Sequence, residues 1–322
     1  MKPDGFAADL YRKPEVLQRL AAKLSDGNPW REVVPPDTER VVLLGMGSSA
    51  YAGGVAAARM RARGIVASSE LASSQLLPDW QDGTLVVATS AGGGSAETLD
   101  ALGRLPGSVH SVALTNTAGS AITQRCDAVV NLAAEPEAGG VACRSYQHTL
   151  AMLLALECHL AGDGTEALAH AVGLTADASA YLLDTETDWR LEVSEPLLGS
   201  TGTYLAAPAH RFCSAQQGAL MLREGPLLPA VWCETGDWSR VDVYLTKTTD
   251  YRLLVFAGSR WEEQLAEWTT QRDSTVVGIG GVVPGAHYNL RYPGDSNDVV
   301  RLLAEVLVPE LMAARAWQAQ RM

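Results

Sequence analysis

Two short loops in the first half of the sequence combine glycines and serines as phosphate-binding loops do. The first covers residues 45–49 (GMGSS) and the second covers residues 89–95 (TSAGGGS). Each follows a branched apolar run that predicts a buried strand, and each precedes a stretch of helix-forming residues. At such a junction the glycines let the backbone approach an anion, and free N–H groups at the positive helix end face it. The pair predicts a site for one phosphorylated ligand.

The elements that must position these loops follow an alternating pattern. Predicted strands at residues 41–45, 84–89 and 110–114 alternate with predicted helices, which is typical of βαβ units around a parallel sheet. The same region has further predicted strands at 65–68 and 128–132, and helices at 49–63 and 95–105.

A similar pattern restarts in the second half. Strands are predicted at 202–206, 252–257 and 275–279, and helices at 211–223 and 296–322. We therefore expect an α/β fold with two doubly wound subdomains, whose parallel sheets are flanked by helices. Residues 1–180 and 181–322 are the expected domains.

The bulk composition indicates a soluble, enzyme-sized chain. Its 322 residues are 47% hydrophobic, which supports one large or two modest domains. The formal net charge of −12 argues against a nucleic-acid partner. The beginning of the sequence has no apolar run that predicts a signal peptide or membrane span. Five unclustered cysteines indicate free thiols in the cytoplasm, not a disulfide framework or zinc site.

Six segments, in order, resemble the tandem SIS (sugar isomerase) domain family. This family includes the isomerase half of glucosamine-6-phosphate synthase and related sugar-phosphate isomerases and deaminases. The segments that carry the resemblance are residues 10–17 (LYRKPEVL), 45–53 (GMGSSAYAG), 90–99 (SAGGGSAETL), Thr115-Asn116 with Ser120, 140–146 (GVACRSY) and 218–224 (GALMLRE). The resemblance covers nearly the whole chain and implies SIS-type α/β subdomains.

The resemblance also implies which residues bind the sugar phosphate. The candidates are Ser48, Ser49, Ser90, Gly92, Gly93, Gly94, Ser95, Thr98, Val141 and Cys143. Hydroxyls and the backbone N–H groups of residues 92–95 would contact the phosphate oxygens. The alternative is that the hydroxyls only cap helices, as Ser and Thr often do. For Ser95 both roles are compatible, because both use the same helix end.

Glu224 falls on the glutamate that the family uses as its enolisation base. Aldose–ketose isomerisation moves a proton between C1 and C2 through an enediol, which requires a shielded carboxylate of raised pKa. The neighbouring residues Leu220, Met221 and Leu222 are apolar enough to raise that pKa by desolvation. The alternative is a glutamate on the helix surface ahead of the Gly225-Pro226 break.

Several positions depart from the family pattern. Ala91 and Gly92 replace the second loop's usual glutamine and serine, and Met221 replaces a lysine. Arg240 stands where relatives have the ring-opening histidine, and an arginine cannot act as a base near neutral pH. It is a candidate substrate-binding residue or a surface arginine. The second copy's loop at 206–210 (AAPAH) lacks the family's glycines, and the C-terminal 318–322 segment lacks its lysine.

His148 and His210 are the candidates for a replacement ring-opening base. His148 follows the 140–146 segment, and His210 precedes the helix that carries Glu224. A lone histidine at a helix start more often has a structural role, so a structural role is the alternative for both residues. No histidine pair has metal-ligand spacing, and we expect neither a metal nor an organic cofactor.

The segment 232–238 (WCETGDW) is unusual in a chain with three phenylalanines. It is expected to be either a loop that carries substrate contacts from Glu234 or Asp237, or a dimer-interface segment with two tryptophan anchors.

The leading hypothesis is a cytoplasmic, homodimeric sugar-phosphate or aminosugar-phosphate isomerase or deaminase, with Glu224 transferring the proton. We expect no glutaminase domain before the SIS-like region. The alternatives are a SIS protein that binds a phosphosugar as a regulator and a repurposed SIS enzyme of specialised metabolism. Met221 and Arg240 favour the regulator, whereas the presence of Glu224 disfavours it.

Overall fold

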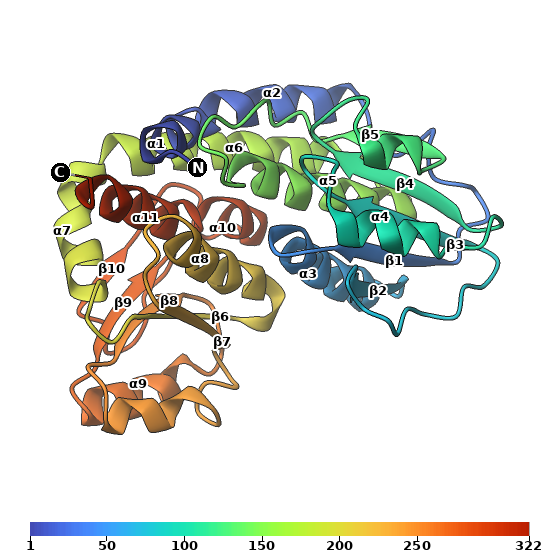
Figure 1. The fold of residues 1–322 in the computed structure, drawn as a ribbon. Coiled ribbons are helices and arrows are strands. Elements are labelled where there is room, and N and C mark those ends of the chain that lie inside the picture. The colour runs from blue at the N-terminus through green and yellow to red at the C-terminus, as the bar shows by residue number, and fades with distance from the viewer. Residues whose placement is uncertain (322) are drawn as a thin grey trace. The chain divides into compact units, whose positions relative to one another are not determined.

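The computed structural model describes residues 1–321, and these residues form two parallel sheets of five strands each (Figure 1). The strand orders are β2-β1-β3-β4-β5 and β10-β9-β8-β6-β7. In both sheets the second strand lies at an edge beside the first, and the remaining strands are added on the other side. This is the doubly wound arrangement of open α/β sheets. The predicted fold class is confirmed.

The first sheet is built from residues that favour buried strands. Its strands are β1 (Arg40–Gly45), β2 (Val66–Leu71), β3 (Thr84–Thr89), β4 (His110–Thr115) and β5 (Ala128–Asn131). Every residue of β3 is buried, as expected for a parallel strand covered on both faces. The helices of this region are α2 (Lys13–Asp26), α3 (Ser48–Ala62), α4 (Ala96–Gly103), α5 (Arg144–Leu160) and the 3₁₀ turn η1 (Ala121–Gln124). Helix α6 (Glu166–Asp184) follows α5 in the chain, and most of it belongs to the unit that contains the second sheet.

The second sheet repeats this layout. Its strands are β6 (Thr203–Ala207), β7 (Ala230–Glu234), β8 (Arg252–Phe256), β9 (Thr275–Ile279) and β10 (Tyr288–Leu290). Its helices are α7 (Glu186–Leu197), α8 (Phe212–Glu224), α9 (Glu262–Gln271), α10 (Asp298–Ala304) and α11 (Leu307–Ala319), with the 3₁₀ turns η2 (Ala209–Arg211) and η3 (Asp242–Lys247). Figure 1 shows α8 and α9 on opposite faces of this sheet. That follows from right-handed crossovers that run in opposite directions along the sheet.

Some elements differ from the sequence prediction. Strand β7 includes Trp232 and Glu234, so the first part of the expected loop at 232–238 is an edge strand. The expected closing helix at 296–322 is two helices, α10 and α11. Pro309 lies in the first turn of α11, where the missing N–H of a proline costs little. In the interior of one continuous helix the same proline would be disruptive. Helix α9 was missed because its sequence, EEQLAEWTTQ, has few apolar residues.

Contacts divide the chain into two compact units that differ from the expected domains. The first-sheet unit comprises residues 16–136 and 142–170, and the second-sheet unit comprises residues 1–15, 137–141 and 171 onward. Helix α1 (Pro3–Tyr11) thus belongs with the second sheet, where the rings of Phe6 and Trp317 lie 6.3 Å apart. Among residues 1–321 no helix has the length and apolar content needed to cross a membrane.

Candidate functional site

The two Gly/Ser loops leave adjacent strands at the same edge of the first sheet. Strands β1 and β3 pair in parallel, with Leu44 opposite Ala88 near their carboxyl ends. From β1 the chain passes through α3 to β2 on one side, whereas β3 lies on the other side. The crevice between β1 and β3 is therefore the topological switch point, where open α/β sheets bind ligands. The two strands that carry the loops are therefore neighbours in the sheet.

The first loop leads directly into the amino end of α3. Gly47 is the residue before the helix and has φ +50°, a conformation that favours glycine. In the part of the chain that the structure describes, no side chain caps this helix end. The positive end of α3 is thus open to an anion. Ser48 and Ser49 form its first turn and are both partly exposed.

The second loop is held in place at Gly93. This residue has φ +69°, and a Cβ there would lie 2.0 Å from the Ser120 hydroxyl oxygen. Its N–H donates to the Ser90 carbonyl, and its carbonyl accepts from the Ile122 N–H, both at 3.0 Å. Gly92 and Gly94 are exposed, and a Cβ on either would meet nothing within 4 Å. The loop therefore has one fixed glycine between two that face open space.

Residues at the end of β4 hold the backbone of the second loop through hydrogen bonds. The Thr115 hydroxyl donates to the Ala91 carbonyl at 3.2 Å, and the Asn116 N–H donates to the same oxygen at 3.0 Å. The Ser90 N–H donates to the Leu114 carbonyl at 3.1 Å, and only 9% of Ser90 is exposed. The Thr-Asn…Ser pattern noted in the sequence thus positions the loop backbone.

Ser95 and Thr98 form the amino end of α4. The Ser95 oxygen accepts from the Thr98 N–H at 3.3 Å and from the Thr98 hydroxyl at 3.1 Å. Thr98 is fully buried, so its hydroxyl orients Ser95. The Ser95 hydroxyl donates to Glu97 at 2.9 Å. Hydrogen bonds from its own backbone N–H and from Ser95 lower the pKa of Glu97. A carboxylate therefore lies at the helix end where an incoming phosphate would bind.

Val141, Cys143 and His148 are all buried. Val141 belongs to the second-sheet unit, whereas Cys143 and His148 belong to the first-sheet unit. His148 Nδ1 donates to the Leu132 carbonyl at 2.8 Å, because a carbonyl oxygen can only accept. With no exposed surface, His148 has the environment of a structural core histidine.

Glu224 is the last residue of α8 in the second-sheet unit. Its side chain is half-buried, next to the buried Met221 and Leu222. Desolvation raises the pKa of Glu224, as its apolar neighbours predicted. Its catalytic role stays a prediction.

His210 and Arg240 lie elsewhere in the second-sheet unit. His210 is in η2 at the amino end of α8, and Glu224 is at the carboxyl end. A helix of 13 residues is about 20 Å long, so the two side chains of one chain do not share a site. Arg240 is exposed in the turn after β7, where its N–H donates to the Asp237 carbonyl at 2.8 Å.

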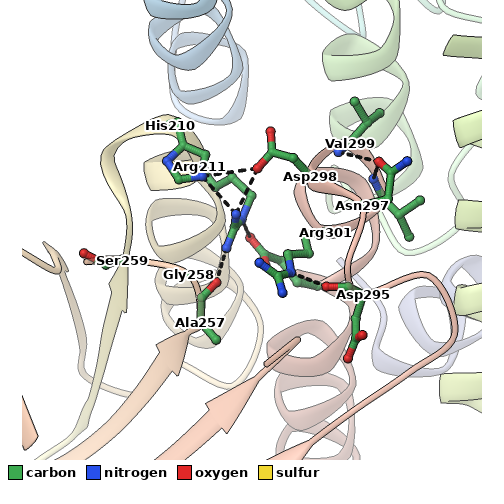
Figure 2. Close-up of polar contacts among 12 residues, drawn as sticks. His210, Arg211, Ala257, Gly258, Ser259, Asp295, Asn297, Asp298, Val299 and Arg301 are labelled. Carbon is green, nitrogen blue, oxygen red and sulfur yellow. Dashed lines mark hydrogen bonds and ion pairs between the residues drawn. The ribbon is translucent and has the colours of Figure 1, made fainter. Parts of the chain in front are cut away.

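Arg211 is a structurally important residue that the sequence analysis overlooked. It is 1% exposed and lies between the loop after β6 and α10 (Figure 2). Its guanidinium donates to Asp298 at 3.0 Å, to Glu305 at 3.1 Å and to the Ala257 carbonyl. The available signal was a charged residue four positions after the buried strand β6.

No group of three His, Cys, Asp or Glu side chains within residues 1–321 could hold a metal ion.

Comparisons with known proteins agree with this geometry. Residues 37–157, which contain both loops, match the SIS domain family. A glutamine–fructose-6-phosphate aminotransferase (isomerizing) from Sulfurisphaera tokodaii is 24% identical over 226 residues, which cover 69% of this chain. The match spans only 38% of that relative's length.

Two solved structures share the fold over nearly the whole chain. The C-terminal domain of glucosamine-fructose-6-phosphate aminotransferase from Francisella tularensis superimposes with a TM-score of 0.78 at 16% identity, covering 98% of this chain and 96% of that one. Tagatose-6-phosphate ketose/aldose isomerase from Escherichia coli gives a TM-score of 0.76 at 15% identity, covering 97% and 92%. The fold is therefore the α/β fold of SIS proteins.

Proposed function

We propose that this chain, whose residues 37–157 match the SIS domain family, acts on a phosphorylated sugar or aminosugar as an isomerase or deaminase. The observation that carries the proposal is the loop pair at the first switch point. There, the uncapped amino end of α3 and the glycine loop held at Gly93 provide the backbone donors that a phosphate requires. The similarity to an isomerizing aminotransferase and to a ketose/aldose isomerase supports this substrate class.

Glu224 is the proposed base. A carboxylate takes the proton from the carbon next to the substrate carbonyl and returns it to the neighbouring carbon through an enediol. Desolvation raises the pKa of Glu224, and a carboxylate of higher pKa is a stronger base that takes the proton from carbon more readily. The proposed reaction uses no organic cofactor, because the substrate's own carbonyl stabilises the enediol.

The experiment measures proton exchange at C2 in deuterium oxide. Wild-type protein is incubated with hexose 6-phosphates and aminohexose 6-phosphates, and NMR follows C2 exchange, isomer formation and ammonia release. Glu224→Gln is expected to slow exchange by roughly 10²- to 10⁴-fold, the usual contribution of a general base, while phosphosugar binding persists. Glu263→Gln is the matched control, because Glu263 is an exposed glutamate on α9.

Two results would contradict the assignment. Exchange that persists in Glu224→Gln would remove Glu224 from the reaction. Binding of phosphosugars by the wild type without any exchange or turnover would favour the second candidate, a phosphosugar-binding regulator. The replacement of the family's lysine and histidine by Met221 and Arg240 is the specific observation behind that candidate.

A homodimer is part of the same proposal. Val231, Val241 and Tyr244 are 45%, 54% and 63% exposed, and they lie in and after the edge strand β7. We propose that this apolar stretch contacts a second copy of the chain. Sedimentation of wild type and Tyr244→Arg would test it, and a wild-type monomer would contradict it.

A further inference from the structure

The second sheet has its own switch point, between β6 and β8. Ala206 lies opposite Val255 in this parallel pair, and β7 lies on the far side of β6. A pocket of about 380 Å³ opens at the carboxyl ends of these strands. Its wall includes residues from the loops after β6 and β8 and from the end of β7. A cavity of this size at a switch point is where an α/β sheet binds a small molecule.

Five side chains give this pocket its chemistry: His210, Glu234, Ser259, Arg260 and Trp261. They supply an imidazole, a carboxylate, a hydroxyl, a guanidinium and an indole. His210 is 47% exposed and Trp261 is 46% exposed, so both have surface available to a ligand. The Arg260 guanidinium lies 4.8 Å from the centre of the indole. The pocket therefore combines an apolar ring with both donors and acceptors.

The Trp261 indole, in the segment after β8, lies against the turn that follows β7. A Cβ on Gly236, in the turn after β7, would lie 2.6 Å from Trp261 Cδ1. In the same turn, the Glu234 carboxylate accepts from the Asp237 N–H at 2.8 Å. The indole and the carboxylate are thus held beside each other by one turn.

The backbone donors that a phosphate would need are already occupied here. The N–H groups of Gly258 and Ser259 donate to one carboxylate oxygen of Glu262, at 2.6 and 2.8 Å. Glu262 is only 8% exposed. An intramolecular carboxylate therefore takes the position that an external anion would take in this loop.

The arginine side chains behind the pocket also have hydrogen-bond partners within the protein. Arg211 donates to Asp298, as Figure 2 shows, and also to Glu305. Arg301 donates to the Asp295 carbonyl. Both guanidinium groups approach Gly258, where a Cβ would meet Arg301 at 3.0 Å and Arg211 at 3.2 Å. The charge of Arg211 is balanced by its two carboxylate partners, and the pocket itself presents Glu234, which repels an anion.

We propose that this pocket binds the ring of an unphosphorylated sugar. A pyranose presents an apolar C–H face that fits an indole, and its hydroxyls both donate and accept. The sugar hydroxyls can therefore accept hydrogen bonds from Arg260 and donate hydrogen bonds to Glu234. A phosphate could pair with the Arg260 guanidinium but not with the Glu234 carboxylate. The pocket volume lies within the range of small-molecule sites. The pocket lining includes neither the two Gly/Ser loops nor Glu224, so this inference goes beyond the proposed reaction.

The test is sugar binding to the full chain. Titration with D-glucose, D-glucosamine and N-acetyl-D-glucosamine, followed by saturation-transfer NMR and calorimetry, is expected to show saturable binding of at least one. Trp261→Ala is expected to weaken binding at least tenfold. Trp268→Ala is the matched control, because Trp268 lies on α9 outside the pocket and is 36% exposed with a guanidinium over its ring. It should bind like the wild type.

Arg260→Ala provides a second variant should Trp261→Ala fail to fold. Arg260 is exposed, and its loss is expected to weaken sugar binding several-fold. The inference is overturned if none of the three sugars binds saturably to the wild type. It is also overturned if folded Trp261→Ala or Arg260→Ala binds as tightly as the wild type, or if inorganic phosphate displaces the sugar.

Discussion

At the residue scale, Gly92 and Gly93 of the second loop differ in the space that is available to an added Cβ. Gly93 has a positive φ and packs against Ser120, whereas Gly92 is exposed and faces open space. The sequence marks both only as glycines in a loop. Their different constraints come from the end of β4 and η1, which lie more than twenty residues further along the chain.

Gly93→Ala is expected to destabilise the fold by about 1–3 kcal/mol, because a residue with a Cβ is strained at this φ and would displace Ser120. Gly92→Ala should change stability by less than about 0.5 kcal/mol. Urea unfolding compares the two variants, and phosphosugar titration should show weaker binding for Gly93→Ala. Equal stability of the two variants would contradict the argument.

The raised pKa of Glu224 has a consequence for stability. Because burial raises the folded-state pKa above its unfolded value, the folded protein binds more protons between the two pKa values. The protonated carboxyl therefore contributes its full stabilisation below the pKa that Glu224 has in the unfolded chain. That stabilisation is lost as the pH rises through the pKa of Glu224 in the folded chain. Glu224→Gln stays neutral, so its melting temperature should exceed that of the wild type near pH 8.

The difference between wild type and Glu224→Gln should become steadily smaller towards about pH 4, where both side chains are uncharged. Melting curves across this range measure it, with Glu263→Gln as the exposed control. A difference that does not change with pH would show that the carboxyl titrates alike in folded and unfolded chains.

At the element scale, one buried arginine connects three elements around the second switch point. Arg211 links the start of α8 to α10 through Asp298 and Glu305 and to the end of β8 through the Ala257 carbonyl. Glu305 is fully buried, so it depends on this guanidinium for charge compensation.

Arg211→Met is expected to lower the free energy of unfolding by about 3–5 kcal/mol, because it leaves the Glu305 carboxylate buried without its partner. The double variant Arg211→Met/Glu305→Leu should recover most of that loss, since well-packed apolar side chains replace a buried ion pair at little cost. Urea unfolding of both proteins measures the difference. No recovery in the double variant would show that Arg211 acts mainly through Asp298 and the Ala257 carbonyl.

At the scale of the whole molecule, the first fifteen residues belong to the second-sheet unit. Lys13 and Glu310 form an ion pair with no exposed surface, and the Tyr11 hydroxyl donates to Glu186 at 3.0 Å. Arg315 donates to the same tyrosine at 2.8 Å. The start of the chain is thus part of the structure around α7 and α11.

Deletion of residues 1–15 is expected to destabilise the second-sheet unit selectively, by about 3–5 kcal/mol, because Glu310 loses its buried partner. Hydrogen exchange should speed up in α7 and α11 and stay unchanged in β1 and β3. Faster exchange in the first sheet alone would contradict the division into units.

Much of the fold could be predicted from local pattern. The apolar runs before both loops and the helix-forming stretches after them are local features, and β3 was predicted to the residue. The edge strand β7 and helix α9 were not predicted, because their residues are mixed in polarity and tertiary contacts stabilise them. The loop residues of the candidate site followed from composition. The burial of His148 and Thr98 did not, since it depends on which helix face is covered.

By itself, the sequence determined the α/β class, the strand–loop–helix junctions and the glycines suited to a phosphate. These depend on interactions between residues close in the chain, which local composition records. Only the tertiary structure decided that the leading helix belongs with the second sheet and that His210 and Glu224 lie at opposite ends of α8. It also decided that Glu262 occupies the backbone donors of Gly258 and Ser259 in the loop after β8. Those outcomes depend on crossover direction and side-chain packing, which bring together groups that a linear pattern does not relate.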